Sequence, residues 1–134
     1  MSRRDRKKAG QLPPGWSPLY ENVLATDAVR TLPPAFYRVY VVACAFCKPY
    51  INGAVPLARS QMRRLGVTSS RTMTRAIAEL IARKLIVCTK PARPRHAALY
   101  GVTHLPLSIP AMEKAGISAS TRSHMESEIS DPHG

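Results

Sequence analysis

Apolar residues recur at a helical spacing in two neighbouring segments near the middle of the chain. In residues 58–65 they fall at i, i+4 and i+7, and they are Ala58, Met62 and Leu65. In residues 70–82 they fall at i, i+4, i+7 and i+8, and they are Met73, Ile77, Leu80 and Ile81. Side chains at these spacings share one face of a helix. The pattern therefore predicts two amphipathic helices, each with its apolar face in a core.

A tight turn is expected between these two helices. Gly66 can adopt the left-handed conformation that commonly ends a helix, and Val67 can return to the core. The hydroxyl side chains of residues 68–70 then offer an N-cap for the second helix.

A longer apolar stretch, "LPPAFYRVYVVACAFCKPYING", precedes this pair. Its two prolines suit the start of a helix, and the residues after them are apolar on nearly every side. The β-branched Val39, Val41 and Val42 would also tolerate a strand. Length and the proline start favour a buried central helix, which is expected to end before a turn at Asn52 and Gly53.

Extended structure is expected on either side of the helix pair. The segment "AVPL" reads as a short extended piece before it, and "LIVCTK" reads as a strand after it. The basic loop "PARPRH" then leads to a returning strand, "AALYGVT", in which Gly101 indicates a bulge. The predicted order is helix, short strand, helix, tight turn, helix, strand, basic loop, strand.

The charge of the chain narrows the range of partners. Its 134 residues suit one domain of ordinary size, and 20 basic residues against 8 acidic ones give a formal net charge of +12. Such an imbalance destabilises a compact state by self-repulsion, which points to a polyanionic partner. A chain merely made soluble by arginine is the alternative. It explains poorly why residues 55–103 hold ten basic residues and a single acid, Glu79.

The two ends of the chain differ from the middle. Residues 1–15 read as a disordered basic arm, which is either a nucleic-acid-binding extension or a solvated tail. Residues 16–107 form the predicted domain, and residues 108–134 a C-terminal extension with a short helix and then a flexible tail.

The sequence favours a cytoplasmic location, in the host cytoplasm or at the nucleoid, with no membrane contact. The basic start is followed by prolines rather than by the apolar segment of a signal peptide. The longest apolar run, "VYVVACAFC", is too short to span a bilayer, and three cysteines without a leader suit a reducing compartment.

The exposed face of the second amphipathic helix has the chemistry of a DNA-reading surface. A helix fits the major groove, and an arginine that makes a bidentate contact with guanine is worth ~1–3 kcal/mol of discrimination. Hydroxyl groups and backbone N–H groups at the helix start can bind phosphates. The predicted contact residues are Ser69, Ser70, Arg71, Thr72, Thr74 and Arg75. For Arg71 and Arg75 a merely solvated face is the alternative.

Two further groups of basic residues are expected to contact the DNA backbone. On the preceding helix these are Arg59, Arg63 and Arg64. On the loop they are Lys90, Arg93, Arg95 and His96, which would lie along phosphates or enter the minor groove. Each neutralised phosphate should add roughly −0.9 to the slope of log K against log salt.

Two segments carry a resemblance to a known group of proteins. They are "NGAVPLARSQMRRLGVTSSRTMTRAIAELIARKLI" and "RHAALYGVTHLPL", and they resemble the winged helix–turn–helix superfamily. The likeness is greatest to small phage, plasmid and bacterial DNA-binding proteins, and it spans about residues 24–107. It implies an α+β, mainly helical fold, in which a three-helix core carries a β-hairpin wing whose tip is the basic loop.

One position departs from the pattern of this superfamily. Lys84 stands where such sequences usually have glycine between the recognition helix and the next strand. A lysine in the left-handed region costs on the order of 1 kcal/mol. Either that cost is accepted or the helix ends differently.

The sequence-based hypothesis is a sequence-specific double-stranded DNA-binding protein, a small transcriptional regulator of phage or mobile-element type. The alternative is a winged-helix protein-interaction module, such as a phage-encoded inhibitor of a host nucleic-acid-binding complex. A replication initiator is less favoured, because those usually carry two winged-helix units. A homodimer is also expected, with Met112, Ala115 and Ile117 as contacts in a C-terminal helix.

No enzyme, metal or cofactor is expected. Cys44 and Cys47 have the spacing of half a zinc site or of a redox pair, but no second pair follows, so they read as buried thiols. Cys88 reads as a core residue of a strand. The four histidines make no metal-binding spacing, and the basic middle of the chain lacks paired carboxylates.

Overall fold

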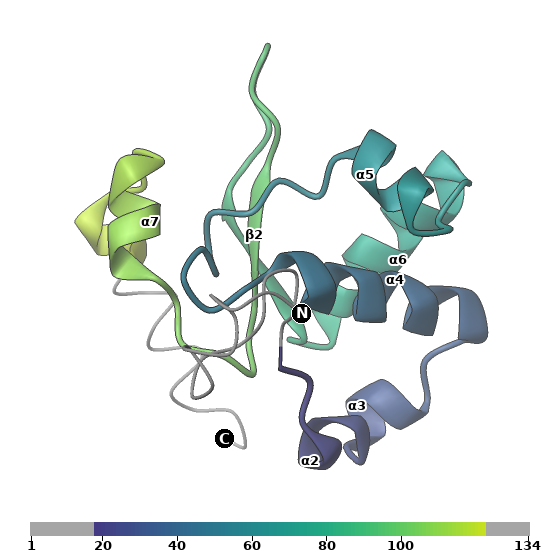
Figure 1. The fold of residues 1–134 in the computed structure, drawn as a ribbon. Coiled ribbons are helices and arrows are strands. Elements are labelled where there is room, and N and C mark those ends of the chain that lie inside the picture. The colour runs from purple at the N-terminus through teal and green to yellow at the C-terminus, as the bar shows by residue number, and fades with distance from the viewer. Residues whose placement is uncertain (1–17, 123–134) are drawn as a thin grey trace, which may run out of the picture.

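The computed structural model describes residues 18–122, which form an α+β fold that is mainly helical (Figure 1). The described helices are α2 (Glu21–Leu24), α3 (Asp27–Arg30), α4 (Pro34–Phe46), α5 (Arg59–Arg64), α6 (Ser70–Ala82) and α7 (Ile109–Lys114). Strands β1 (Ile86–Lys90) and β2 (Leu99–Val102) form an antiparallel sheet. The predicted basic arm, residues 1–15, and residues 123–134 of the predicted tail lie outside the described residues. The part of that tail at residues 119–122 is helical, so it is not a loose end.

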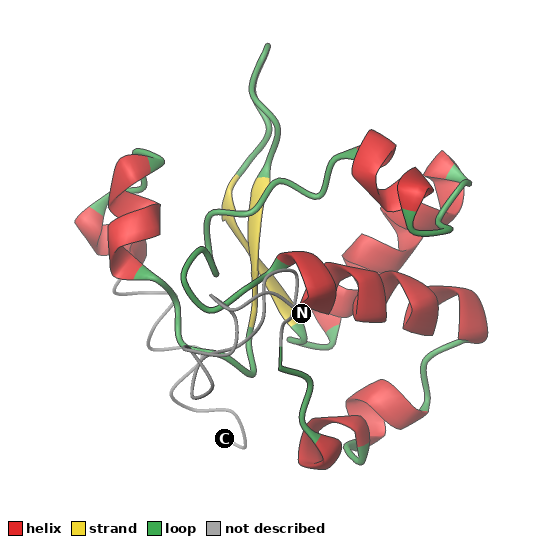
Figure 2. Cartoon of the chain, in the orientation of Figure 1, coloured by secondary structure: helices red, strands yellow, loops and turns green. Residues whose placement is uncertain are grey.

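The hairpin formed by β1 and β2 divides the structure. In Figure 1 it rises between α7 on one side and the helices α4, α5 and α6 on the other. The strands occupy only its base, and both arms continue as loop to a projecting tip (Figure 2). No helix within residues 18–122 combines the length and the apolar character needed to cross a bilayer.

The prediction of a buried central helix is confirmed by α4. Pro34 stands in its first turn, where the missing N–H would have had no partner in the helix. The helix packs on α6 and contributes a set of buried residues to the core, namely Val39, Tyr40, Val42, Ala43 and Cys44. The strand alternative for this stretch is therefore wrong.

The two amphipathic helices and the turn between them are also confirmed. Gly66 has a φ of 99°, and the Val67 N–H donates to the Met62 carbonyl (2.9 Å), which closes α5 in a Schellman motif. Ser69 then caps α6, because its hydroxyl accepts a hydrogen bond from the Thr72 N–H (3.1 Å).

Two residues predicted for the core are exposed. On α6 the buried residues are Ala76, Ile77 and Leu80, whereas Ile81 is 38% exposed because it lies at the edge of the stripe that α4 covers. Leu65 is 39% exposed, since α5 ends at Arg64 and the chain leaves the helical path before it. Val67 takes the core position instead, as predicted, at 7% exposed.

The end of α6 repeats the geometry of the glycine turn with a lysine. Lys84 has a φ of 60°, and the Leu85 N–H donates to the Leu80 carbonyl (2.9 Å). The sequence left two alternatives, a strained Lys84 or a different end to the helix. The structure has the first, with Lys84 in the left-handed region. Because of this turn, the side chain of Leu85 lies in the core at the start of the hairpin, where it is 8% exposed.

Arg83 fixes the same end of α6 to α3. Its Nε donates to Glu79 (2.9 Å), and its Nη1 donates to the Ala28 carbonyl (2.9 Å) and the Thr31 hydroxyl (2.7 Å). Glu79, the single acid of residues 55–103, is thus paired within the fold.

The hairpin contains a bulge, but at a different place from the predicted one. The register shifts between Cys88 and Lys90, where buried Thr89 is the extra residue and donates its hydroxyl to the Gly53 carbonyl. Gly101 pairs regularly with Val87, so a bulge there is wrong. A glycine is needed at position 101 for a different reason, because a Cβ there would lie 2.8 Å from the backbone nitrogen of Gly53.

Asn52 joins the helical part of the fold to the hairpin. Its side chain is fully buried, its Oδ1 accepts the Val102 N–H (2.8 Å), and its Nδ2 lies within hydrogen-bond distance of three carbonyls. These belong to Val102 (3.0 Å), Leu105 (3.1 Å) and Pro106 (3.1 Å). The turn predicted at this position therefore also holds β2 in place, through the hydrogen bonds of Asn52 to Val102. Nearby, Val55 forms an isolated antiparallel bridge with Tyr100, in the segment expected to be extended.

The C-terminal helix packs on this turn. Met112 of α7 is fully buried, and a Cβ at Gly53 would lie 2.9 Å from its sulfur. Ile117 is 5% exposed. The prediction of Met112 and Ile117 as dimer contacts is therefore wrong, because their side chains are buried within their own chain.

We expect Asn52→Ala to lower the free energy of unfolding by roughly 2–3 kcal/mol, because it leaves the buried Val102 N–H without its acceptor. Urea denaturation measures this change. Asn22→Ala, on the exposed surface of α2, is the matched control and should change stability by less than about 0.5 kcal/mol. Equal effects of the two variants would contradict the central role of Asn52.

Lys84→Gly should raise the free energy of unfolding by about 1 kcal/mol, because glycine adopts this φ without strain. Lys84→Ala removes the charge but keeps the Cβ, so thermal and urea unfolding should show no comparable gain. A gain from alanine as large as that from glycine would mean that charge repulsion, and not backbone strain, is relieved.

Candidate nucleic-acid interface

The exposed face of α6 carries the side chains predicted to read DNA. Arg71, Thr74 and Arg75 are exposed, whereas Ser70 and Thr72 are half-buried. The opposite face of the same helix packs on α4, and this fixes the direction in which both arginines point. Arg71 and Arg75 are four residues apart, so they stand one above the other on one side of the helix.

The hydroxyl groups at the start of α6 are partly used within the helix. Ser69 is exposed, but its hydroxyl accepts the Thr72 N–H as the cap. Thr74 donates its hydroxyl to the Ser70 carbonyl (3.0 Å). The Thr74 hydroxyl has therefore used its hydrogen, whereas the Ser69 O–H and the two arginines have no acceptor among the hydrogen bonds of the described residues.

The basic residues of the candidate interface have no acidic partner in the described part of the chain. The three ion pairs found there join Arg30 to Asp27, Arg83 to Glu79 and Arg122 to Glu113. The exposed arginines outside these pairs include the predicted backbone-contacting residues of α5, Arg59, Arg63 and Arg64. Five unpaired guanidinium groups on two consecutive helices repel one another, and an anionic partner would relieve that repulsion.

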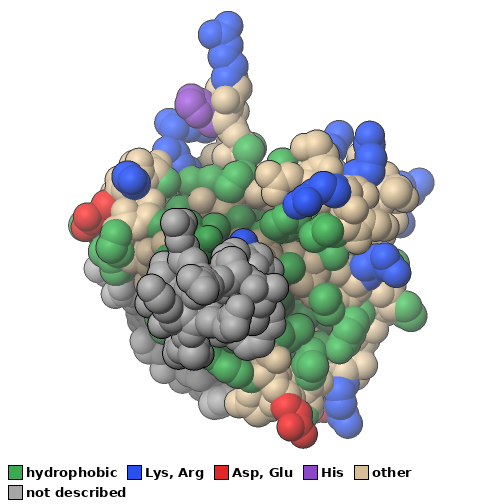
Figure 3. All heavy atoms as spheres, in the orientation of Figure 1, with side chains coloured by type: hydrophobic (Ala, Val, Ile, Leu, Met, Phe, Trp, Pro, Cys, Tyr) green, Lys and Arg blue, Asp and Glu red, His purple; other side chains and the backbone are tan. Residues whose placement is uncertain are grey.

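The tip of the hairpin presents a second basic group. Residues 91–97 are all exposed. Arg93 and His96 exchange two backbone hydrogen bonds of 2.9 and 2.8 Å, which closes a tight turn in which Arg95 has a φ of 67°. Figure 3 shows basic side chains and a histidine on the projecting loop and further basic side chains over α5, whereas the acidic side chains in view lie near α7 and near α2 and α3.

Lys90 does not belong to this tip. Its side chain is half-buried, and its Nζ donates to the Ala115 carbonyl at the end of α7 (2.9 Å). The prediction that Lys90 contacts DNA from the loop is therefore wrong. The sequence could not reveal this, because the acceptor lies 25 residues further along the chain.

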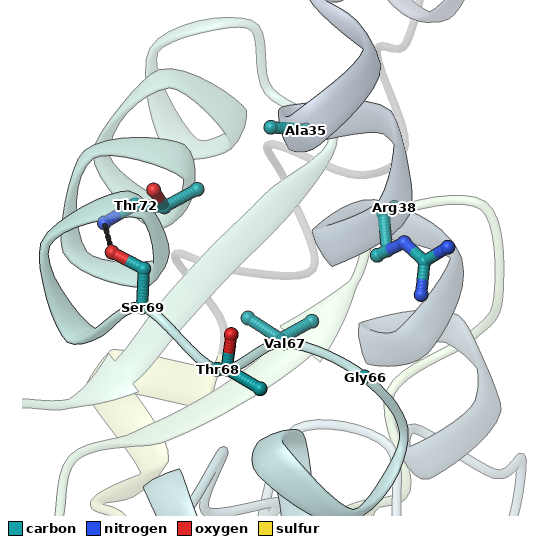
Figure 4. Close-up of a pocket in the computed structure, with 7 residues that line it drawn as sticks. All are labelled: Ala35, Arg38, Gly66, Val67, Thr68, Ser69 and Thr72. Carbon is teal, nitrogen blue, oxygen red and sulfur yellow. Dashed lines mark hydrogen bonds between the residues drawn. The ribbon is translucent and has the colours of Figure 1, made fainter.

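The structure adds one basic residue that the sequence analysis missed. Arg38 projects from α4 over the turn between α5 and α6 and lines a hollow of about 230 Å³ (Figure 4). The hollow is also lined by residues of the turn and the start of α6, namely Gly66, Val67, Thr68, Ser69 and Thr72. The sequence indicates that Arg38 is exposed, because it is a single charged residue in an apolar helix. Only the packing of α4 on α6 shows that it lies beside the turn between α5 and α6.

The thiols of Cys44 in α4 and of Cys47, directly after it, are buried, as predicted. Burial raises the pKa of Cys44 to about 12, and burial together with the nearby Cys44 raises that of Cys47 to about 12. Cys88 lies on β1 but is only half-buried, so its prediction as a core residue is wrong, and burial raises its pKa. Within residues 18–122 no group of three or more His, Cys, Asp or Glu side chains is arranged to hold a metal ion.

Comparison of the chain with models of protein families, with curated proteins and with solved structures found no match.

Lys90 and Arg93 were both predicted as basic residues of the loop, but only Lys90 is half-buried and bonded within the fold. Their effects on stability should therefore differ. Lys90→Met should lower the free energy of unfolding by about 1 kcal/mol, because the Ala115 carbonyl loses a charged donor. Arg93→Met removes the same charge from an exposed site, and urea denaturation should detect no change. An equal loss of stability in both variants would contradict the structural role of Lys90.

Proposed function

We propose that the chain is a winged helix–turn–helix protein that binds double-stranded DNA in a sequence-specific manner. In this proposal α5, the turn at residues 65–69 and α6 form the helix–turn–helix, and the hairpin of β1 and β2 forms the wing. The order of elements, the capped turn at Gly66 and the bridge from Val55 to Tyr100 support this assignment.

One observation carries the proposal, namely that α6 buries its apolar side on α4 and leaves Arg71 and Arg75 exposed without an acidic partner among the described residues. A helix with such a face matches the width of the major groove, where arginine reads guanine by a bidentate contact. Arg59, Arg63 and Arg64 on α5 would neutralise phosphates beside the groove, and the wing tip with Arg93 and Arg95 would reach the adjoining backbone or minor groove.

The biological role in this proposal is that of a small transcriptional regulator of phage or mobile-element type. It draws its support from the resemblance of residues 24–107 to small regulators of that kind. The homodimer expected for such a regulator would need a surface other than Met112 and Ile117, since both are buried in their own chain.

A protein-interaction module is the second candidate, and an exposed tyrosine beside α7 favours it. Tyr50 is 69% exposed, and it lines a hollow with Ile51, Pro110, Ala111 and the charged Glu113 and Lys114. A surface of this kind suits a protein partner. It lies on different elements from the arginines of α5 and α6, so the two functions predict different binding faces.

Selection from a random duplex library, read at two salt concentrations, distinguishes the two candidates. DNA reading predicts an enriched motif and retention that falls steeply with salt, with a slope of log K of roughly −0.9 for each phosphate contacted. If no motif is enriched and retention does not depend on salt, the proposal of DNA binding is wrong.

Arg75→Ala should weaken binding to the preferred site by roughly tenfold or more, and binding to random duplex by much less, because a lost guanine contact is worth ~1–3 kcal/mol. Fluorescence anisotropy with both duplexes measures the ratio. Arg59→Ala is the matched control, since a phosphate contact should be lost equally on both duplexes. Equal losses with Arg75→Ala would argue against base reading by this residue.

A further inference from the structure

One cationic side chain, Arg38, lines the hollow between α4 and the α5–α6 turn. Arg38 stands on the exposed side of α4, and its guanidinium group lies over Gly66, because a Cβ at Gly66 would lie 2.5 Å from Arg38 Nη1. Figure 4 shows this side chain and the turn on facing sides of the hollow. The absence of a side chain at position 66 therefore leaves room for Arg38 over the turn.

The elements on both sides of the hollow are held by the core. The turn is closed by the hydrogen bond from Val67 to Met62, and both of these side chains are buried. On the opposite side Arg38 is followed directly by Val39 and Tyr40, which are fully buried. The backbone that carries Arg38 and the turn that faces it are therefore both held in place before a ligand binds.

The chemistry of the hollow suits an oxyanion. No acidic side chain lines it, and Arg38 has no ion-pair partner in the part of the chain that the structure describes. The hydroxyl of Thr68, an exposed residue of the turn, also lines it. Arginine binds phosphate through a planar fork of donors, which lysine cannot reproduce.

We propose that this hollow holds one phosphate of the nucleic-acid backbone, with Arg38 as its main ligand. The inference rests on the proposed DNA binding and extends the interface from α5 and α6 to α4. The hollow adjoins the start of α6, so a strand bordering the groove that α6 enters would pass Arg38. The contact is made to the backbone and is therefore independent of sequence.

Binding of the full chain to duplex DNA, measured over a range of potassium chloride concentrations, tests this assignment. Arg38→Ala should weaken binding several-fold on preferred and on random duplex alike, and the slope of log K against log salt should fall by about 0.9. Arg38→Lys keeps the charge, so it should retain most of the slope while losing part of the affinity.

The matched control is Arg30→Ala, because Arg30 is an exposed arginine of α3 that is paired with Asp27. It should change neither the affinity nor the slope. Thermal unfolding of each variant establishes that the fold is intact, and Arg38→Gln replaces Arg38→Ala if alanine lowers the melting temperature.

The outcomes separate this inference from the function on which it rests. If the wild-type chain binds no duplex, both fall. If the wild-type chain binds duplex with a steep salt dependence and the Arg38 variants match it, only the phosphate site is wrong. Binding of inorganic phosphate that is lost in Arg38→Ala but leaves the affinity for duplex unchanged would indicate a site for free phosphate and overturn the assignment to the backbone.

Discussion

The position of the hairpin depends on one buried amide side chain. Asn52 follows α4 in the chain, yet its side chain bonds the backbone of β2 and of the segment after it, at Val102, Leu105 and Pro106. A buried polar group with all these partners in place is strongly directional, because any shift would leave donors or acceptors unpaired in the core. The base of the hairpin is thereby held against the helices, and the projecting loop with Arg93 and Arg95 continues from that base.

The basic residues fall into two groups with different roles. Arg83, Lys90 and Arg122 have partners within the protein, and they join α6 to α3, β1 to α7, and the chain after α7 back to Glu113. The arginines of α5 and of the exposed face of α6 have none among the described residues. The first group connects elements of the fold. The second group, together with Arg38, Arg93 and Arg95, carries the charge that a polyanion would neutralise.

Local signals in the sequence predicted the helices and strands. The residues that were placed wrongly are those whose environment depends on tertiary packing. The helical period, Gly66 and the cap at Ser69 depend on neighbours within a few residues, so they could be read directly. Ile81 was assigned to the core because periodicity cannot tell how wide a stripe the partner helix covers. Lys90 and Arg38 depend on contacts with distant segments, at Ala115 and Gly66, and a single sequence carries no signal for either.

The central claim is that the arginine side of α6 is the surface on which a duplex binds. Mapping of backbone amide shifts by nuclear magnetic resonance, during titration with a duplex, tests it most directly. The account predicts that the largest shifts fall on residues 69–75 and 93–96, while α2 and α3 stay unchanged. Shifts confined to Tyr50 and α7, or the absence of any shift, would contradict it.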